Sequence, residues 1–150
     1  MRRLSLVIAA VVSLAGLSAC EPPPPPMPGG IGNCDAPPAP SVDWHNCDMA
    51  GRELSNVNLS YAKLSGINLA GANLANANMY GVDLRGASMI QTLANGADLT
   101  DATLSDANFT GATLSGANLS GTNLTGVIWS NTTCPNGVVQ STECLRTTAG

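Results

Sequence analysis

The chain has 150 residues, of which 44% are hydrophobic, 11% charged and 3% aromatic, and its formal net charge is −4 at pH 7. This acidic balance excludes a protein that binds nucleic acid by neutralising its phosphates. The sequence has one histidine and no Gly-rich phosphate loop, carboxylate pair or metal-ligand cluster. It therefore predicts no enzyme, no cofactor and no metal site.

Residues 1–19 have the pattern of a secretory signal peptide, with a basic start at residues 1–3 and an apolar run at residues 4–17. The run is shorter than the ~20 residues that a membrane-spanning helix needs. It ends in Leu17-Ser18-Ala19-Cys20, which resembles the bacterial lipobox. The resemblance implies cleavage before Cys20, a diacylglycerol thioether on its sulfur, and usually an acylated amino terminus, with palmitate among the chains.

Two or three acyl chains would anchor the protein stably to a membrane. We therefore expect an exported protein of the bacterial cell envelope, lipid-anchored and facing the periplasm. Ordinary secretion, with Cys20 incidental, is the alternative.

The segment 20–40 is expected to be a lipid-anchored tether, because it contains a proline run at residues 22–26 and no apolar pattern. Polyproline II rises about 3.1 Å per residue, so the segment could hold a domain up to roughly 60 Å from its anchor. Proline runs can also be ligands for SH3-like grooves. Beside a lipidated cysteine, the tether is the favoured interpretation.

Residues 47–131 repeat with a period of five, in 17 repeats without an insertion. Residues five apart lie about 140° apart around a helix and on opposite faces of a flat strand, so neither element buries such a pattern. A chain that turns a corner every five residues buries two residues of each five. The large apolar centres of the repeats are Met49, Leu54, Leu59, Leu64, Leu69, Leu74, Met79, Leu84, Met89, Ala94, Leu99, Leu104, Phe109, Leu114, Leu119, Leu124 and Trp129.

The other positions of the repeat are equally regular. A small residue such as Ala107 or Ala117 usually stands two places before the centre, and both positions are expected to face the axis. The last place is usually Gly, Asn or Asp, which tolerate tight corners. Tandem copies of the pattern in Ala117-Asn118-Leu119-Ser120-Gly121 resemble the pentapeptide-repeat proteins. The resemblance implies an all-β fold, a right-handed quadrilateral β-helix with four repeats per coil and about four coils.

Residues 20 apart should stack in columns of this solenoid. Phe109 is then expected inside the rod and Trp129 at its C-terminal end. Ala94 interrupts a column of leucines, so either Leu93 fills the gap or a void remains, and an irregular backbone is expected at residues 92–95. A ligand site there is the less favoured reading.

The four cysteines besides Cys20 flank the repeats and are expected to close the ends of the solenoid. We predict disulfides Cys34–Cys47 and Cys134–Cys144, one at each end of the solenoid. An N-terminal cap is expected at residues 41–46, and a C-terminal cap and tail at residues 132–150. A zinc site is the rival interpretation, but the chain has no Cys-x-x-Cys pair.

The function expected is a non-catalytic, membrane-tethered scaffold or recognition surface with an unidentified protein partner. The outer surface is plain and polar, so Tyr61, Tyr80 and Arg85 form the candidate interaction patch; simple packing of the tyrosines is the alternative. His45, beside Trp44, is expected to be structural. The sequence sets no oligomeric state.

The family resemblance also brings a second hypothesis. Some pentapeptide-repeat proteins are acidic rods that mimic DNA and occupy type II topoisomerases, and Asp98, Asp101 and Asp106 cluster here on one coil. Export would separate this protein from gyrase, so the second hypothesis is disfavoured.

Overall fold

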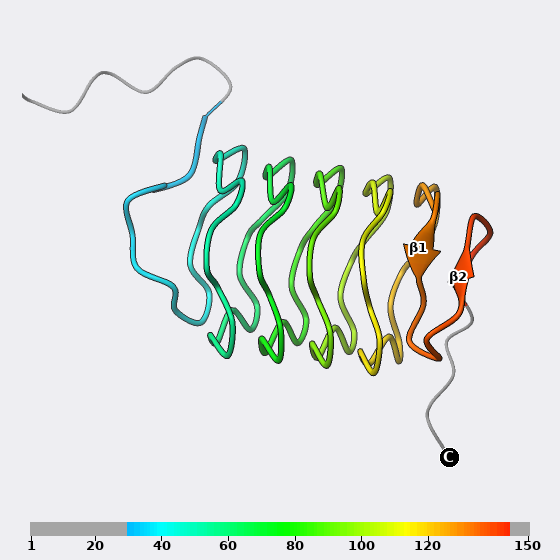
Figure 1. Ribbon diagram of the computed structural model, residues 1–150. Helices are drawn as coiled ribbons and strands as arrows, with labels where there is room; N and C mark the ends of the chain where they lie inside the picture. Colours follow the sequence, from blue (N-terminus) through cyan, green and yellow to red (C-terminus); the bar gives the residue numbers. More distant parts are fainter. Residues whose placement is uncertain (1–29, 145–150) are drawn as a thin grey trace, which may run out of the picture.

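The computed structural model describes residues 30–144. The predictions for the signal peptide, Cys20 and the proline run fall on residues 1–29 and lie outside the described residues. The described chain winds into a stack of coils (Figure 1), with residues 30–40 at one end and a small hairpin at the other.

The coils are joined by parallel pairing between residues 20 apart. Fifteen parallel β-bridges run from the pair Asp43 and Lys63 to the pair Thr113 and Thr133. At each interior side, three backbone hydrogen bonds connect neighbouring coils, as when Leu84 N donates to Thr103 O at 2.8 Å, Gly86 N donates to Ser105 O at 2.9 Å and Thr103 N donates to Val82 O at 2.9 Å. Bridged residues stand singly along each side, because the chain turns before a longer strand can form.

Longer strands occur only at the C-terminal end of the described chain. Strand β1 (Thr132–Thr133) pairs antiparallel with β2 (Val139–Gln140), with Thr132 opposite Gln140. The hairpin folds back beside the last side of the solenoid, where Thr133 also bridges Thr113.

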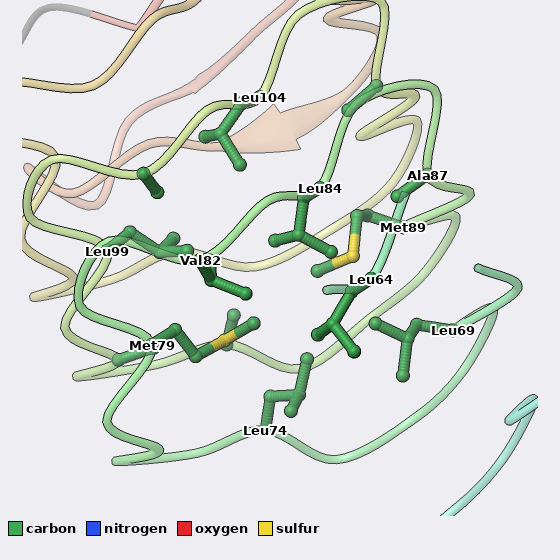
Figure 2. Packing of buried hydrophobic residues seen from close by; sticks show 14 of the residues in the cluster. Leu64, Leu69, Leu74, Met79, Val82, Leu84, Ala87, Met89, Leu99 and Leu104 are labelled. Atoms are coloured by element: carbon green, nitrogen blue, oxygen red, sulfur yellow. The ribbon is translucent and has the colours of Figure 1, made fainter. Parts of the chain in front are cut away.

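The two inward positions of the repeat are those that the sequence predicts. The centres and the residues two places before them form one continuous apolar core, with most side chains fully buried. Figure 2 shows labelled members of this core from several sides of the coil, among them Leu64, Met79 and Leu99, filling the interior. Phe109 is fully buried, and Trp129 at the C-terminal end stacks on it with ring centroids 5.4 Å apart, so both expectations are confirmed.

The corners have one backbone conformation. Every fifth residue from Ser41 to Asn131 is left-handed, with φ between 50° and 71°. Glycine adopts this conformation freely, and Asn and Asp tolerate it better than other residues do. This explains the last position of the repeat, and it makes the bulky corner residues Tyr61 (φ 58°) and Gln91 (φ 55°) exceptions.

The coils extend further than the sequence boundaries of 47 and 131. Trp44, expected in a cap, occupies the centre position of an additional repeat and is only 1% exposed. Cys134 takes the centre position after Trp129 and is also 1% exposed. A five-residue pattern defined by Leu and Ala does not include Trp and Cys at these positions, although their size and apolarity fit the axis.

Residues 30–40 also differ from the expected tether. Gly32 N donates to His45 O at 2.7 Å, and Asn33 N donates to Asp43 O at 2.8 Å. The indole Nε1 of Trp44 donates to Ala36 O at 3.2 Å. This segment therefore packs over the first coil as a cap, and the part of the chain available as a tether ends before residue 30.

The expected irregularity at residues 92–95 is absent. Leu93 bridges Asn73 and Thr113 like any outward residue and is 45% exposed, so it does not fill the space beside Ala94. The backbone stays regular because Leu93 N and Leu93 O both bond to neighbouring coils. The two inward residues of this repeat, Ala94 and Thr92, are both fully buried, and Thr92 donates its hydroxyl to Leu69 O at 2.7 Å.

Candidate interaction surface

Tyr61 and Tyr80 lie together at one corner of the solenoid, as their positions in the repeat predict. Their ring centroids are 5.3 Å apart and the ring planes cross at 82°, an edge-to-face contact. Tyr61 is 59% exposed. Such aromatic contacts contribute about 0.5–1.5 kcal/mol beyond the area they bury.

Gly81 provides the place where the Tyr61 ring lies. A Cβ atom built on Gly81 would come within 2.8 Å of Tyr61 Cε1 and 2.9 Å of Cδ1. Residue 81 is the corner directly after residue 61 in the same column, so the ring extends along the column across a corner that has no side chain.

Asp101 is the next corner of this column and completes the group. The hydroxyl of Tyr80 donates to Asp101 Oδ2 at 3.0 Å. This hydrogen bond is the largest cause that raises the pKa of Tyr80 to about 12, with a smaller contribution from Tyr61. Tyr80 therefore remains a neutral hydrogen-bond donor at physiological pH. We call Tyr61, Tyr80 and Asp101 the tyrosine corner.

Arg85 does not join the tyrosine corner. Its guanidinium binds Asp83 through Nε to Oδ1 at 2.8 Å and Nη2 to Oδ2 at 2.7 Å. The bidentate pair lowers the pKa of Asp83 and raises that of Arg85. The repeat pattern does not predict this ion pair, because Asp83 and Arg85 lie on either side of one centre and their pairing depends on the side-chain rotamers.

From the sequence, Asp101 is expected in an acidic cluster with Asp98 and Asp106 and not beside the tyrosines. The column spacing could have placed it, since residues 61, 81 and 101 are 20 apart and the glycine between them leaves the ring room to reach the acid. Asp98, by contrast, accepts the Thr100 hydroxyl, and Asp106 Oδ1 lies where a Cβ on Gly126 would be.

The histidine forms a small polar group at the N-terminal end. His45 Nδ1 and Asp43 Oδ1 are 2.6 Å apart, and Lys63 Nζ lies 3.9 Å from Asp43 Oδ2. The hydrogen bond from His45 lowers the pKa of Asp43. No hydroxyl or thiol is hydrogen-bonded to His45 in the described part of the chain, so the group has no nucleophile to activate.

Both predicted cysteine pairs are joined in the structure. Cys34 and Cys47 have Cα atoms 5.5 Å apart, and Cys134 and Cys144 have Cα atoms 5.4 Å apart. Cys47 and Cys134 occupy inward positions of the repeat, so each disulfide attaches a terminal segment directly to the core. Within residues 30–144, no group of three or more His, Cys, Asp or Glu side chains could hold a metal ion.

A cavity of about 300 Å³ lies between the N-terminal cap and the first coil. Its walls combine Pro37 and Pro38 from the capping segment with Trp44, Arg52 and Glu53 from the coil. In residues 30–144 there is no helix of the length and apolarity that crossing a membrane requires.

Residues 53–89 and 95–128 match the family of pentapeptide repeats, in eight copies. A solved pentapeptide repeat protein from the cyanobacterium Cyanothece 51142 is similar with 37% identity and a TM-score of 0.54, over 57% of each chain. A pentapeptide repeat protein of the Arabidopsis thaliana thylakoid lumen has 25% identity and a TM-score of 0.35, over 68% of this chain and 84% of its own.

The plasmid-mediated fluoroquinolone resistance protein QnrB1 has 24% identity and a TM-score of 0.27, over 56% of this chain and 63% of its own. No curated protein sequence matches the chain. The chain spans 57% of the length of the Cyanothece protein.

Proposed function

Because the chain carries a solenoid of pentapeptide repeats, we propose that it is a non-catalytic lipoprotein of the bacterial cell envelope that presents a rigid protein-interaction surface. The observation that carries the proposal is the order of the segments along the chain. A lipobox ending in Cys20 is followed by a proline run and then by a folded domain, whose first segment is attached to the core by the disulfide Cys34–Cys47.

The rigidity follows from the backbone pairing. Each interior coil bonds to both neighbours, and the repeating corner conformation gives a surface whose side chains stand at fixed spacings. Such a surface suits recognition, because few backbone groups must be ordered when a partner binds.

The experiment that tests the proposal is mass spectrometry of the mature protein. We expect the N-terminal peptide to begin at Cys20 and to carry a diacylglycerol group, and Cys20→Ser to remove the acyl mass and release the protein from membranes. A wild-type mature protein with an unmodified Cys20 thiol would refute the anchor.

Mimicry of DNA toward a type II topoisomerase is the second candidate function. The cluster of Asp98, Asp101 and Asp106 favours it, and the export signal argues against it.

A further inference from the structure

The tyrosine corner carries an unbalanced negative charge. The ion pairs within residues 30–144 join Asp43 to His45 and Lys63, and Asp83 to Arg85. Asp101 has no cation beside it in this part of the chain. Its Oδ2 accepts one hydrogen bond from a neutral phenol, which orients the carboxylate and leaves its charge in place.

The tyrosine rings make the electrostatic potential at the corner more negative, because the π face of an aromatic ring is electrostatically negative. The Tyr61 ring lies over Gly81, which is the corner one coil before Asp101 in the same column, and Tyr61 is 59% exposed. It is also attached to a left-handed backbone, which an aromatic residue adopts only against a steric penalty. Packing against neighbouring residues does not by itself require a ring to be this exposed, so the exposed face of Tyr61 is available to a partner.

We infer that the tyrosine corner binds the guanidinium group of an arginine side chain on a partner protein. The guanidinium would stack on the exposed face of Tyr61 and donate N–H groups to the Asp101 carboxylate. Arginine fits better than lysine, because its planar group can stack on a ring and donate in plane at the same time. The inference rests on the proposed interaction surface and names its partner chemistry.

Binding can be measured on the full-length protein by NMR, because its two tyrosines give only two sets of ring signals. The probes are three blocked tripeptides, Gly-Xaa-Gly, in which the central residue is arginine, lysine or citrulline. Citrulline has nearly the shape of arginine and no charge. We expect the arginine peptide to shift the Tyr61 ring signals with a dissociation constant of about 1 mM. Lysine should bind at least threefold more weakly, and citrulline should cause no saturable shift.

Two variants separate recognition from folding. Asp101→Asn keeps an oxygen for the Tyr80 hydroxyl and removes the charge, so arginine affinity should fall about fivefold or more. Tyr61→Gly removes the ring at a corner where glycine is favoured, so it should fold and lose binding. Gln91→Gly, at the equivalent corner of another column, is the matched control and should bind like the wild type.

Saturable binding of citrulline equal to that of arginine, or unchanged affinity in Asp101→Asn, would overturn the inference. A lysine peptide that binds as tightly as arginine would overturn the choice of guanidinium. None of these results depends on acylation at Cys20, so failure here and failure of the lipoprotein proposal are distinguishable.

Discussion

At the residue scale, the positions of the five-residue repeat differ in what they require: some require a side chain of a given size, and one requires a particular backbone conformation. The two inward positions select for volume, and the corner position selects for a left-handed backbone. For a residue with a side chain, the left-handed conformation costs roughly 1–2 kcal/mol. A local function or contact must compensate for that at Tyr61, whose ring is packed edge-to-face with Tyr80.

The crowding of the axis can be tested by a paired substitution. Ala107 is fully buried two places before a centre, so Ala107→Leu should force overpacking of about 1–3 kcal/mol. Thermal unfolding should show a midpoint several degrees lower than that of the wild type.

Thr110→Leu is the control, since Thr110 follows the centre and lies on the outer surface, where its hydroxyl donates to Asn108. We expect its midpoint to move little. Equal losses from the two substitutions would show that the inward register is assigned incorrectly.

The raised pKa of Tyr80 can be measured directly. In Tyr61→Phe, Tyr80 is the one remaining tyrosine, and its tyrosinate absorbance should appear well above the ordinary pKa of 10.0 but below the wild-type value of about 12, because the smaller contribution of the Tyr61 hydroxyl is removed. Adding Asp101→Asn removes the charged acceptor, so the pKa should fall toward 10.0.

The sign of the linked stability follows from that shift. A pKa raised on folding adds stability that is fully present below the unfolded value of 10.0 and is lost as the pH rises toward 12. A Tyr80 that titrates at its ordinary pKa in the Tyr61→Phe protein would mean that the bond to Asp101 does not form in solution.

At the scale of the elements, the sequence predicts the repeats well and their ends poorly. Inside the solenoid each side is determined locally, by two inward residues and one corner, so a five-residue pattern is sufficient. Each end coil has no neighbouring coil on one face, so its residues make contacts with the capping segments that interior repeats do not make. The segment at residues 30–40 is attached to the first coil by the hydrogen bond from the Trp44 indole to Ala36 O and by the disulfide Cys34–Cys47. Neither contact can be predicted from the five-residue period.

The same reasoning applies to the candidate site. The column rule brings Tyr61 and Tyr80 together, because it depends only on spacing. The column rule does not predict the ion pair of Arg85, since a long surface side chain can reach acids outside its own column, and Arg85 binds Asp83. The rule does not extend to residues 92–95 either, where the hydroxyl of Thr92 and the ladder hydrogen bonds keep the backbone regular.

Removal of the two disulfides should lower the stability of the protein by unequal amounts. Each closes a short loop, with sequence separations of 13 and 10 residues, which corresponds to about 3 kcal/mol of chain entropy per cross-link. Cys34→Ala with Cys47→Ala should lose about that amount, because Cys47 already occupies a position that takes alanine in other repeats.

Cys134→Ala with Cys144→Ala should lose more, since Cys134 fills a centre position and alanine would leave a cavity there. Reduction of the wild-type protein without substitution is the control, because it breaks both cross-links at nearly unchanged volume. Denaturant unfolding that shows no loss in either double variant would refute the role of the disulfides as caps, and free thiols in a non-reducing peptide map would refute the pairing.

At the scale of the whole molecule, charge decides between the two candidate functions. Duplex DNA carries one negative charge per ~1.7 Å of its axis, so a stretch of about 20 Å carries roughly 12 charges. The 19 left-handed corners from Ser41 to Asn131, at four per coil, make nearly five coils, which at ~4.8 Å per coil reach about that height. The whole chain has 10 acidic residues, and Asp43 and Asp83 are paired with cations.

Purified mature protein should therefore leave the supercoiling of DNA by gyrase unaffected at micromolar concentration. The chain has fewer acidic residues than such a stretch of DNA has charges, and only Asp98, Asp101 and Asp106 cluster on one coil, so they do not reproduce the regular charge spacing of a duplex. A supercoiling assay over a range of protein concentrations provides the measurement, with Asp98→Asn/Asp106→Asn as the companion variant. Inhibition by the wild type that this variant relieves would revive DNA mimicry, and it would contradict the proposal that the protein is exported and anchored at Cys20.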